Sequence, residues 1–302
     1  MRWDQNYSNP EVEDRRGESF SGGGLGGGGI GLFGILRFAS MFGWKGIVVG
    51  LIIAAFVGFG GQCLGGGQPQ QQQQRSSSTQ HYQGSPDEER AAKFVGYVLE
   101  DVQKTWRAQI PGYKDVASLV LFRRGIKGGC GVATTAIGPF YCPVDKKVYI
   151  DLSFYDELKN QLGAPGDFAE AYVIAHEVGH HVQDLKGLLG GTGRDNSIHT
   201  ELQADCLAGA WARDAEKRGE LEVGDIDEAL NAASQIGDDA LQRKAGGTVQ
   251  PETWTHGSSA QRNASFKKGY AEGAAGCGIA PQPRRRRLPG PAAVGEGVLA
   301  AP

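Results

Sequence analysis

The chain contains the pattern H-E-x-x-H within residues 175–181, which read AHEVGHH. On a helix, His176 and His180 are four residues apart, so both imidazoles lie on one face and can bind a single zinc ion. Glu177 lies about 100° around that helix, near enough to act as general base on a water that zinc activates. The pattern therefore predicts a helix that supplies two ligands to a metal ion.

The flanking residues support this helix, because apolar side chains recur at helical spacing on both sides of the pattern. Asp167 is suited to the start of the helix and Gly187 to its end. The alternative is an ordinary buried helix with two histidines. A matching set of acidic residues further along the chain disfavours that alternative.

This second set lies within residues 201–211, which predict another helix. Glu201 and Asp205 are four residues apart and share one face. A catalytic zinc has three protein ligands and one open position, so Glu201 is the expected third ligand, and His199 and His181 are weaker candidates. Asp205 is expected to hydrogen-bond the far nitrogen of a ligand histidine. Surrounding apolar residues favour a packed helix over a solvated acidic face.

Metzincins are excluded by the residues after the second histidine. That class has glycine and histidine three and six positions later, where this chain has Gln183 and Lys186.

The chain resembles the putative neutral zinc metallopeptidase family of bacterial, membrane-anchored proteins. The resemblance covers the chain from its N-terminus to about Cys277 and implies zinc peptidase chemistry without specifying a substrate. Besides H-E-x-x-H, the matching stretches are residues 12–17 (VEDRRG), 138–143 (GPFYCP), 148–154 (VYIDLSF) and 201–209 (ELQADCLAG).

H-E-x-x-H followed by a helix with Glu-x-x-x-Asp also resembles the gluzincin class of metalloproteases. Residues 255–262 are similar to a histidine-containing segment near the site of some membrane gluzincins, with Gly257 where proline is usual. This likeness implies a catalytic role for His256 in stabilising the oxyanion on the attacked carbonyl. A surface histidine in a loop is the alternative.

The domain itself is expected to begin with a helix at Ser85, which has proline next and Glu88 three residues later, as in a capping box. Alternation predicts strands in residues 117–122 and 148–152, and the stretch between Cys130 and Cys142 resembles a hairpin. The expected fold class is α+β: a mainly helical, zincin-like domain with a small antiparallel sheet, preceded by one transmembrane helix.

The composition divides the chain into five segments. Residues 1–43 are expected to be a disordered cytoplasmic head with a glycine-rich linker, 44–64 a transmembrane helix, and 65–84 a Gly/Gln/Ser linker. The metallopeptidase domain is expected at residues 85–278 and a disordered tail at 279–302.

The predicted span has about the 20 apolar residues that a bilayer core requires. Arg37 and Lys45 lie on its N-terminal side, and no charge follows until Arg75. The positive-inside rule therefore predicts a cytoplasmic N-terminus and an extracytoplasmic domain. A cleaved signal peptide is less favoured, because no Ala-x-Ala site follows the apolar run.

Two disulfides are expected among the five cysteines. Cys130 and Cys142 are placed symmetrically across the predicted hairpin. Cys206 and Cys277 are the remaining pair once Cys63, beside the membrane, is set aside. An oxidising compartment permits both.

We therefore expect a membrane-anchored zinc endopeptidase with a peptide or protein substrate. The formal charge of −3 indicates no nucleic-acid partner. The alternative is a non-catalytic, zinc-stabilised module that binds envelope partners, although a structural zinc would not need Glu177. An intramembrane protease is disfavoured by the charged residues around H-E-x-x-H.

Overall fold

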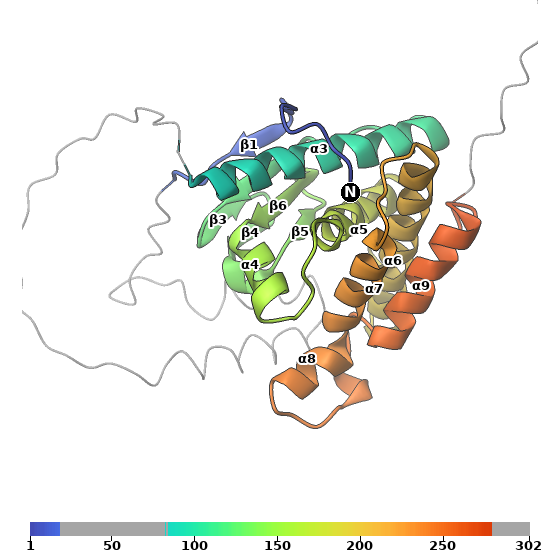
Figure 1. The fold of residues 1–302 in the computed structure, drawn as a ribbon. Helices are drawn as coiled ribbons and strands as arrows, with labels where there is room; N and C mark the ends of the chain where they lie inside the picture. The colour runs from blue at the N-terminus through green and yellow to red at the C-terminus, as the bar shows by residue number, and fades with distance from the viewer. Residues whose placement is uncertain (19–81, 83, 280–302) are drawn as a thin grey trace, which may run out of the picture.

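The computed structural model describes residues 1–18, 82 and 84–279, which form a mainly helical α+β domain (Figure 1). Its strands are β1 (Val12–Asp14), β2 (Ser118–Phe122), β3 (Gly125–Gly128), β4 (Gly131–Thr134), β5 (Phe140–Cys142) and β6 (Lys147–Asp151). Its helices are α3 (Pro86–Gln109), α4 (Ser153–Asn160), α5 (Asp167–Leu185), α6 (Arg194–Lys217), α7 (Asp225–Gln235), α8 (Asp238–Lys244) and α9 (Ser259–Glu272).

The main sheet has the order β1-β2-β6-β5, and the hairpin β3-β4 forms a separate pair. β1 and β6 both run parallel to β2, and only β5 is antiparallel to its neighbour. The expected antiparallel sheet is therefore wrong, because the chain between β2 and β6 returns to the sheet in the same direction. All five residues of β2 are buried, as is usual for a strand covered on both faces.

The N-terminal residues 1–18 belong to this domain. Their strand β1 pairs with β2 in the register Val12↔Leu119, and Glu11 accepts a hydrogen bond from Gln103 of α3. The expected disordered head is therefore wrong for this part of the chain. Its apolar pattern is weak because charged and polar side chains hold this short edge strand in place, for example Glu13 with Lys147 at 2.6 Å.

The helix α5 runs through the middle of the domain, in contact with α3, α6 and α7. The expected start of α3 is present: Ser85 and Glu88 form a capping box. The apolar stripe of α3 packs into a core whose largest fully buried side chains include Trp106, Phe168 and Trp211. α5 begins at Asp167 and ends two residues before Gly187, close to the predicted bounds.

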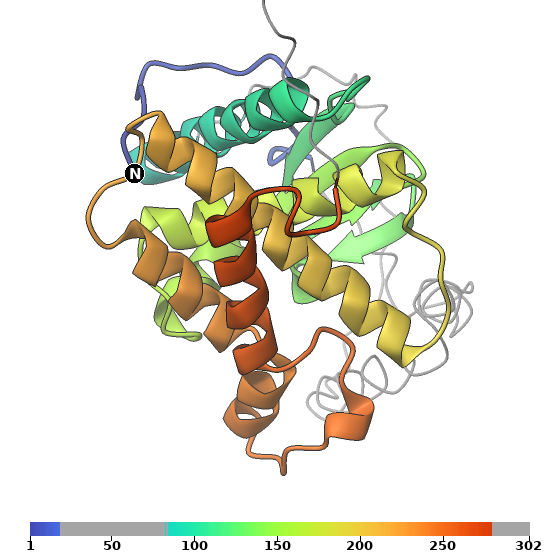
Figure 2. The ribbon, with the colours of Figure 1, turned by 90° about the vertical axis from the view of Figure 1, so that its right-hand side faces the viewer.

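The helices α6 and α9 cross at a pair of glycines (Figure 2). A Cβ on Gly209 would overlap the carbonyl oxygen of Phe266, and one on Gly269 would overlap that of Cys206. The crossing thus brings the two backbones into direct contact.

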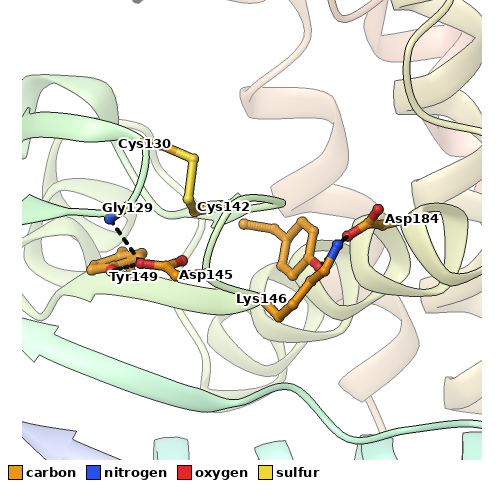
Figure 3. Close-up of a disulfide and its surroundings, with 8 residues drawn as sticks. Gly129, Cys130, Cys142, Asp145, Lys146, Tyr149 and Asp184 are labelled. Atoms are coloured by element: carbon orange, nitrogen blue, oxygen red, sulfur yellow. Dashed lines mark hydrogen bonds and ion pairs between the residues drawn. A yellow bond between two sulfur atoms is a disulfide. The ribbon is translucent and has the colours of Figure 1, made fainter.

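Both expected disulfides are present, Cys130–Cys142 and Cys206–Cys277. The predicted hairpin between the first two cysteines is wrong, however. Cys130 lies in the turn between β3 and β4, and Cys142 ends β5, which pairs with β6 instead (Figure 3). The disulfide therefore joins the hairpin to the edge of the main sheet. Nearby, Lys146 pairs with Asp184 of α5 at 2.6 Å.

Within the described residues, no helix has the length and apolar character needed to cross a bilayer. The predicted span at 44–64 and the predicted tail from 280 onward lie outside those residues.

Candidate metal centre

Three side chains converge where α5 faces α6. His176 and His180 project from α5 toward Glu201 of α6, and their potential ligand atoms all lie within 4.8 Å of one another. The Nε2 atom of His176 is 3.2 Å from one Glu201 oxygen, and the Nε2 atom of His180 is 3.6 Å from the other. Bonds of about 2.0–2.2 Å to a tetrahedral zinc would separate its ligand atoms by roughly 3.3–3.5 Å. The set therefore fits this metal.

The other nitrogen of each histidine is already occupied. The Nδ1 atom of His176 lies 2.8 Å from Asp205, as predicted, and that of His180 lies 2.8 Å from the amide oxygen of Gln183. Because those oxygens accept, each ring keeps a proton on Nδ1, which leaves Nε2 as the nitrogen that can bind the metal. Gln183 is held in turn by the carbonyl oxygen of Thr200.

The two alternative third ligands lie elsewhere. His199 is exposed on the outer side of α6. His181 is buried, and both its nitrogens are engaged: Nδ1 with the Tyr141 hydroxyl at 2.9 Å and Nε2 with the carbonyl oxygen of Lys114 at 2.7 Å.

Asp205 belongs to a buried network behind His176. Arg262 of α9 donates to both of its oxygens, each at 2.9 Å, and also to the hydroxyl of Tyr172. Burial by itself would raise the pKa of Asp205, but the charges and hydrogen bonds of Arg262 and His176 together outweigh it and lower this pKa to about 2. Asp205 therefore stays ionised at any physiological pH.

The charge of Asp205 acts on His176. Burial alone would lower the pKa of His176, but the charge and hydrogen bond of Asp205, together with Glu201, raise it to about 10. Burial alone would raise the pKa of Glu201, but the neighbouring His180 and His176 lower it well below its usual range. The metal-free site thus holds a proton that zinc must displace.

Glu177 lies next to the metal position, only 7% exposed. Burial raises its pKa above the usual value, against the opposing charges of His180 and His176. A backbone hydrogen bond from Tyr141 connects it to β5. A glutamate with a raised pKa beside a metal is suited to accept and then return a proton.

His256 lies in the same cleft as Glu177 and Glu201. Its Nδ1 atom is 3.1 Å from Asp238. The other oxygen of Asp238 accepts the backbone N–H groups of Thr255, His256 and Gly257 at 2.7–3.0 Å. Asp238 therefore fixes both the turn and the ring. Burial lowers the pKa of His256, but the hydrogen bond to Asp238 and the charges of Glu201 and Asp238 raise it, so the protonated ring can donate from Nε2.

The cleft has a volume of about 1040 Å³. Its walls come from η1 (Thr135–Ile137), β5, α4, α5 and the glycine-rich connection between α5 and α6, with apolar side chains that include Phe140, Phe154, Val173 and Leu189. β5 is an edge strand of the sheet. An extended chain could therefore lie along it.

Sequence reasoning missed Arg262, Gln183 and Asp238. Arg262 lies in residues 255–262, the segment singled out by its resemblance, but only His256 was assigned a role there. Gln183 follows His180 by three residues, within one helical turn. Asp238 had no signal, since its role depends on a contact with residues 17–19 positions later.

The family model described as Putative neutral zinc metallopeptidase matches residues 1–278. The uncharacterized protein YpfJ of Escherichia coli is 43% identical over 287 residues, which cover 90% of this chain and 96% of that protein. The uncharacterized protein Rv2575 of Mycobacterium tuberculosis is 44% identical over 189 residues, covering 57% of this chain and 64% of that protein. No solved structure matches the chain significantly.

Proposed function

Because the chain belongs to the putative neutral zinc metallopeptidase family, we propose that it is a zinc-dependent endopeptidase of gluzincin type. The observation that carries the proposal is the convergence of His176, His180 and Glu201, with the Nε2 atoms of both histidines facing the same carboxylate. These three residues would hold zinc. When bound, zinc polarises the scissile carbonyl and makes a water molecule a nucleophile near neutral pH.

Glu177 is the proposed general base. It takes a proton from the attacking water and returns it to the leaving amine nitrogen, for which its raised pKa is suited. His256 is proposed to donate from Nε2 to the oxygen of the attacked carbonyl as negative charge develops there. Asp238 accepts from Nδ1 and so orients the ring. Although burial lowers the pKa of His256, the hydrogen bond to Asp238 and the charges of Glu201 and Asp238 raise it, so the ring can carry a second proton on Nε2.

The proposed substrate is a peptide in extended conformation. β5 is at the edge of the sheet, lines the cleft and is connected through Tyr141 to Glu177. Strand addition along such an edge satisfies the backbone of a peptide and leaves its side chains to apolar pockets. The disulfide at Cys142 fixes the end of that edge.

The test is Glu177→Gln, with Glu157→Gln as control, since both residues line the cleft but only Glu177 adjoins the ligands. We expect Glu177→Gln to keep its zinc and its fold and to lose at least about 10²-fold in turnover of a peptide library, because proton transfer contributes about 10²–10⁴-fold. Glu157→Gln should cleave normally. If Glu177→Gln cleaves as fast as the parent, Glu177 is not the general base. A parent that holds zinc and cleaves nothing would favour the non-catalytic binding module.

A further inference from the structure

The described residues on the two sides of residues 19–81 meet at one place on the domain. The buried guanidinium of Arg16 pairs with Asp14 at 2.6 Å and with Glu89, in the first turn of α3, at 2.9 Å. The same guanidinium lies over the ring of Tyr82, 4.9 Å from its centroid. One side chain thus joins the two ends of the intervening stretch.

The segment before residue 18 is an integral part of the sheet. β1 pairs with β2 over its full length, and the amide of Asn9 donates to the carbonyl oxygen of Gly96 at 2.9 Å. Glu13 accepts from Ser118 of β2 and from Lys147 of β6 at 2.7 and 2.6 Å. In Figure 1, β1 runs beside α3. These contacts require residues 1–18 and the rest of the domain to share one compartment.

The apolar stretch 44–64 lies between those two parts. A single crossing would place β1 and β2 on opposite sides of a hydrocarbon core about 30 Å thick, where they could not pair. Residues 19–81 contain no second apolar stretch of about 20 residues with which the chain could return. The single-pass arrangement expected from the charge asymmetry is thus incompatible with the sheet.

We propose that residues 1–18 and 84–279 lie on the same side of the membrane, because their strands β1 and β2 pair in one sheet. The proposal rests on the sheet and does not depend on peptidase activity.

The test places single cysteines in the full-length chain, in a Cys63→Ser background. Ser8→Cys reports on the N-terminal segment and Glu252→Cys on the domain, since both positions are exposed and outside the metal centre. Intact cells are treated with a membrane-impermeant maleimide, and permeabilised cells serve as the control in which both positions react. We expect both to be labelled in intact cells, because disulfides persist only in a non-reducing compartment. Protection of both would also support the proposal. Labelling of one alone would overturn it.

A second measurement tests the pairing within membranes. Val12→Cys with Leu119→Cys joins register partners of adjacent strands, within reach of a disulfide. Val12→Cys with Val148→Cys is the matched control, since Val148 is one strand further away, on β6. Peptide mapping of the membrane-extracted chain should find a bond in the first pair alone. Its absence there would remove the premise of the proposal.

Discussion

Arg262 and Asp205 form a buried, two-pronged ion pair, in which Nε donates to Oδ2 and Nη2 to Oδ1, each at 2.9 Å. The pair joins α9 to α6 directly behind the metal ligand His176. Neither charge has access to bulk water, so each depends on the other for its solvation.

We predict that Arg262→Ala lowers the free energy of unfolding of the metal-free domain by about 3–5 kcal/mol, because it leaves a buried carboxylate unpaired. Arg243→Ala is the control, since the Arg243 side chain is 57% exposed in its pair with Asp239 and exposed pairs contribute about 1 kcal/mol or less. Urea denaturation measures both. A loss for Arg262→Ala as small as that for Arg243→Ala would contradict this account.

Zinc titration distinguishes the role of Glu201 from that of Asp205. Glu201→Ala should abolish tight binding, because only two protein ligands remain. Asp205→Asn should weaken binding about 10–100-fold, as the loss of a partner behind a ligand does. His199→Ala is the control and should bind zinc normally, since His199 is exposed away from the cluster. Normal zinc affinity in Glu201→Ala would mean that another residue is the third ligand.

His256 should matter for turnover and not for zinc affinity. We predict that His256→Ala lowers the turnover number about 10²–10³-fold, as the loss of one oxyanion donor typically does, with zinc stoichiometry unchanged. Asp238→Asn should also reduce turnover, because Asp238 orients the ring, whereas Asp239→Asn should not, because Asp239 holds Ser259 instead. If His256→Ala cleaves at the parent rate, this histidine is only part of the turn.

Zinc binding at neutral pH should release protons. The pKa of His176 in the metal-free domain is raised to about 10, so the ring is protonated at pH 7 and must lose that proton to coordinate. The raised pKa stabilises the metal-free fold fully below the unfolded value of about 6.5, and this contribution is lost as pH rises through 10. Apparent zinc affinity should rise about tenfold per pH unit between 7 and 9. Calorimetry in two buffers of different ionisation enthalpy measures the protons released, and a value near zero would contradict the prediction.

The metal centre was accessible to sequence reasoning because its spacing is helical. His176, His180 and Glu201, with Asp205 behind them, depend on periodicity within two helices, and the structure brings these residues together. The pairing of strands that are distant in the sequence leaves no such periodic pattern. The parallel neighbours of β2 come from residues far apart in the sequence.

The disulfide prediction shows a related limit. Cys130 and Cys142 are bonded, but through the hairpin β3-β4 and the edge strand β5, and not through the single hairpin that suggested the pair. Charged residues were equally hard to interpret. Residues 12–17 were expected to belong to a disordered head, although Arg16 is 3% exposed and pairs with two carboxylates.

The crossing of α6 and α9 limits how this sequence can diverge. Gly209 and Gly269 each face the backbone of the other helix, so a larger residue at one position gains no room from a change at the other. A saturation library should therefore recover glycine at both sites independently, without compensating pairs. Because α6 contains Asp205 and α9 contains Arg262, even one methyl group there would move apart the two charges that hold His176 in place. Two residues without side chains thus set the tolerance of the metal centre to mutation.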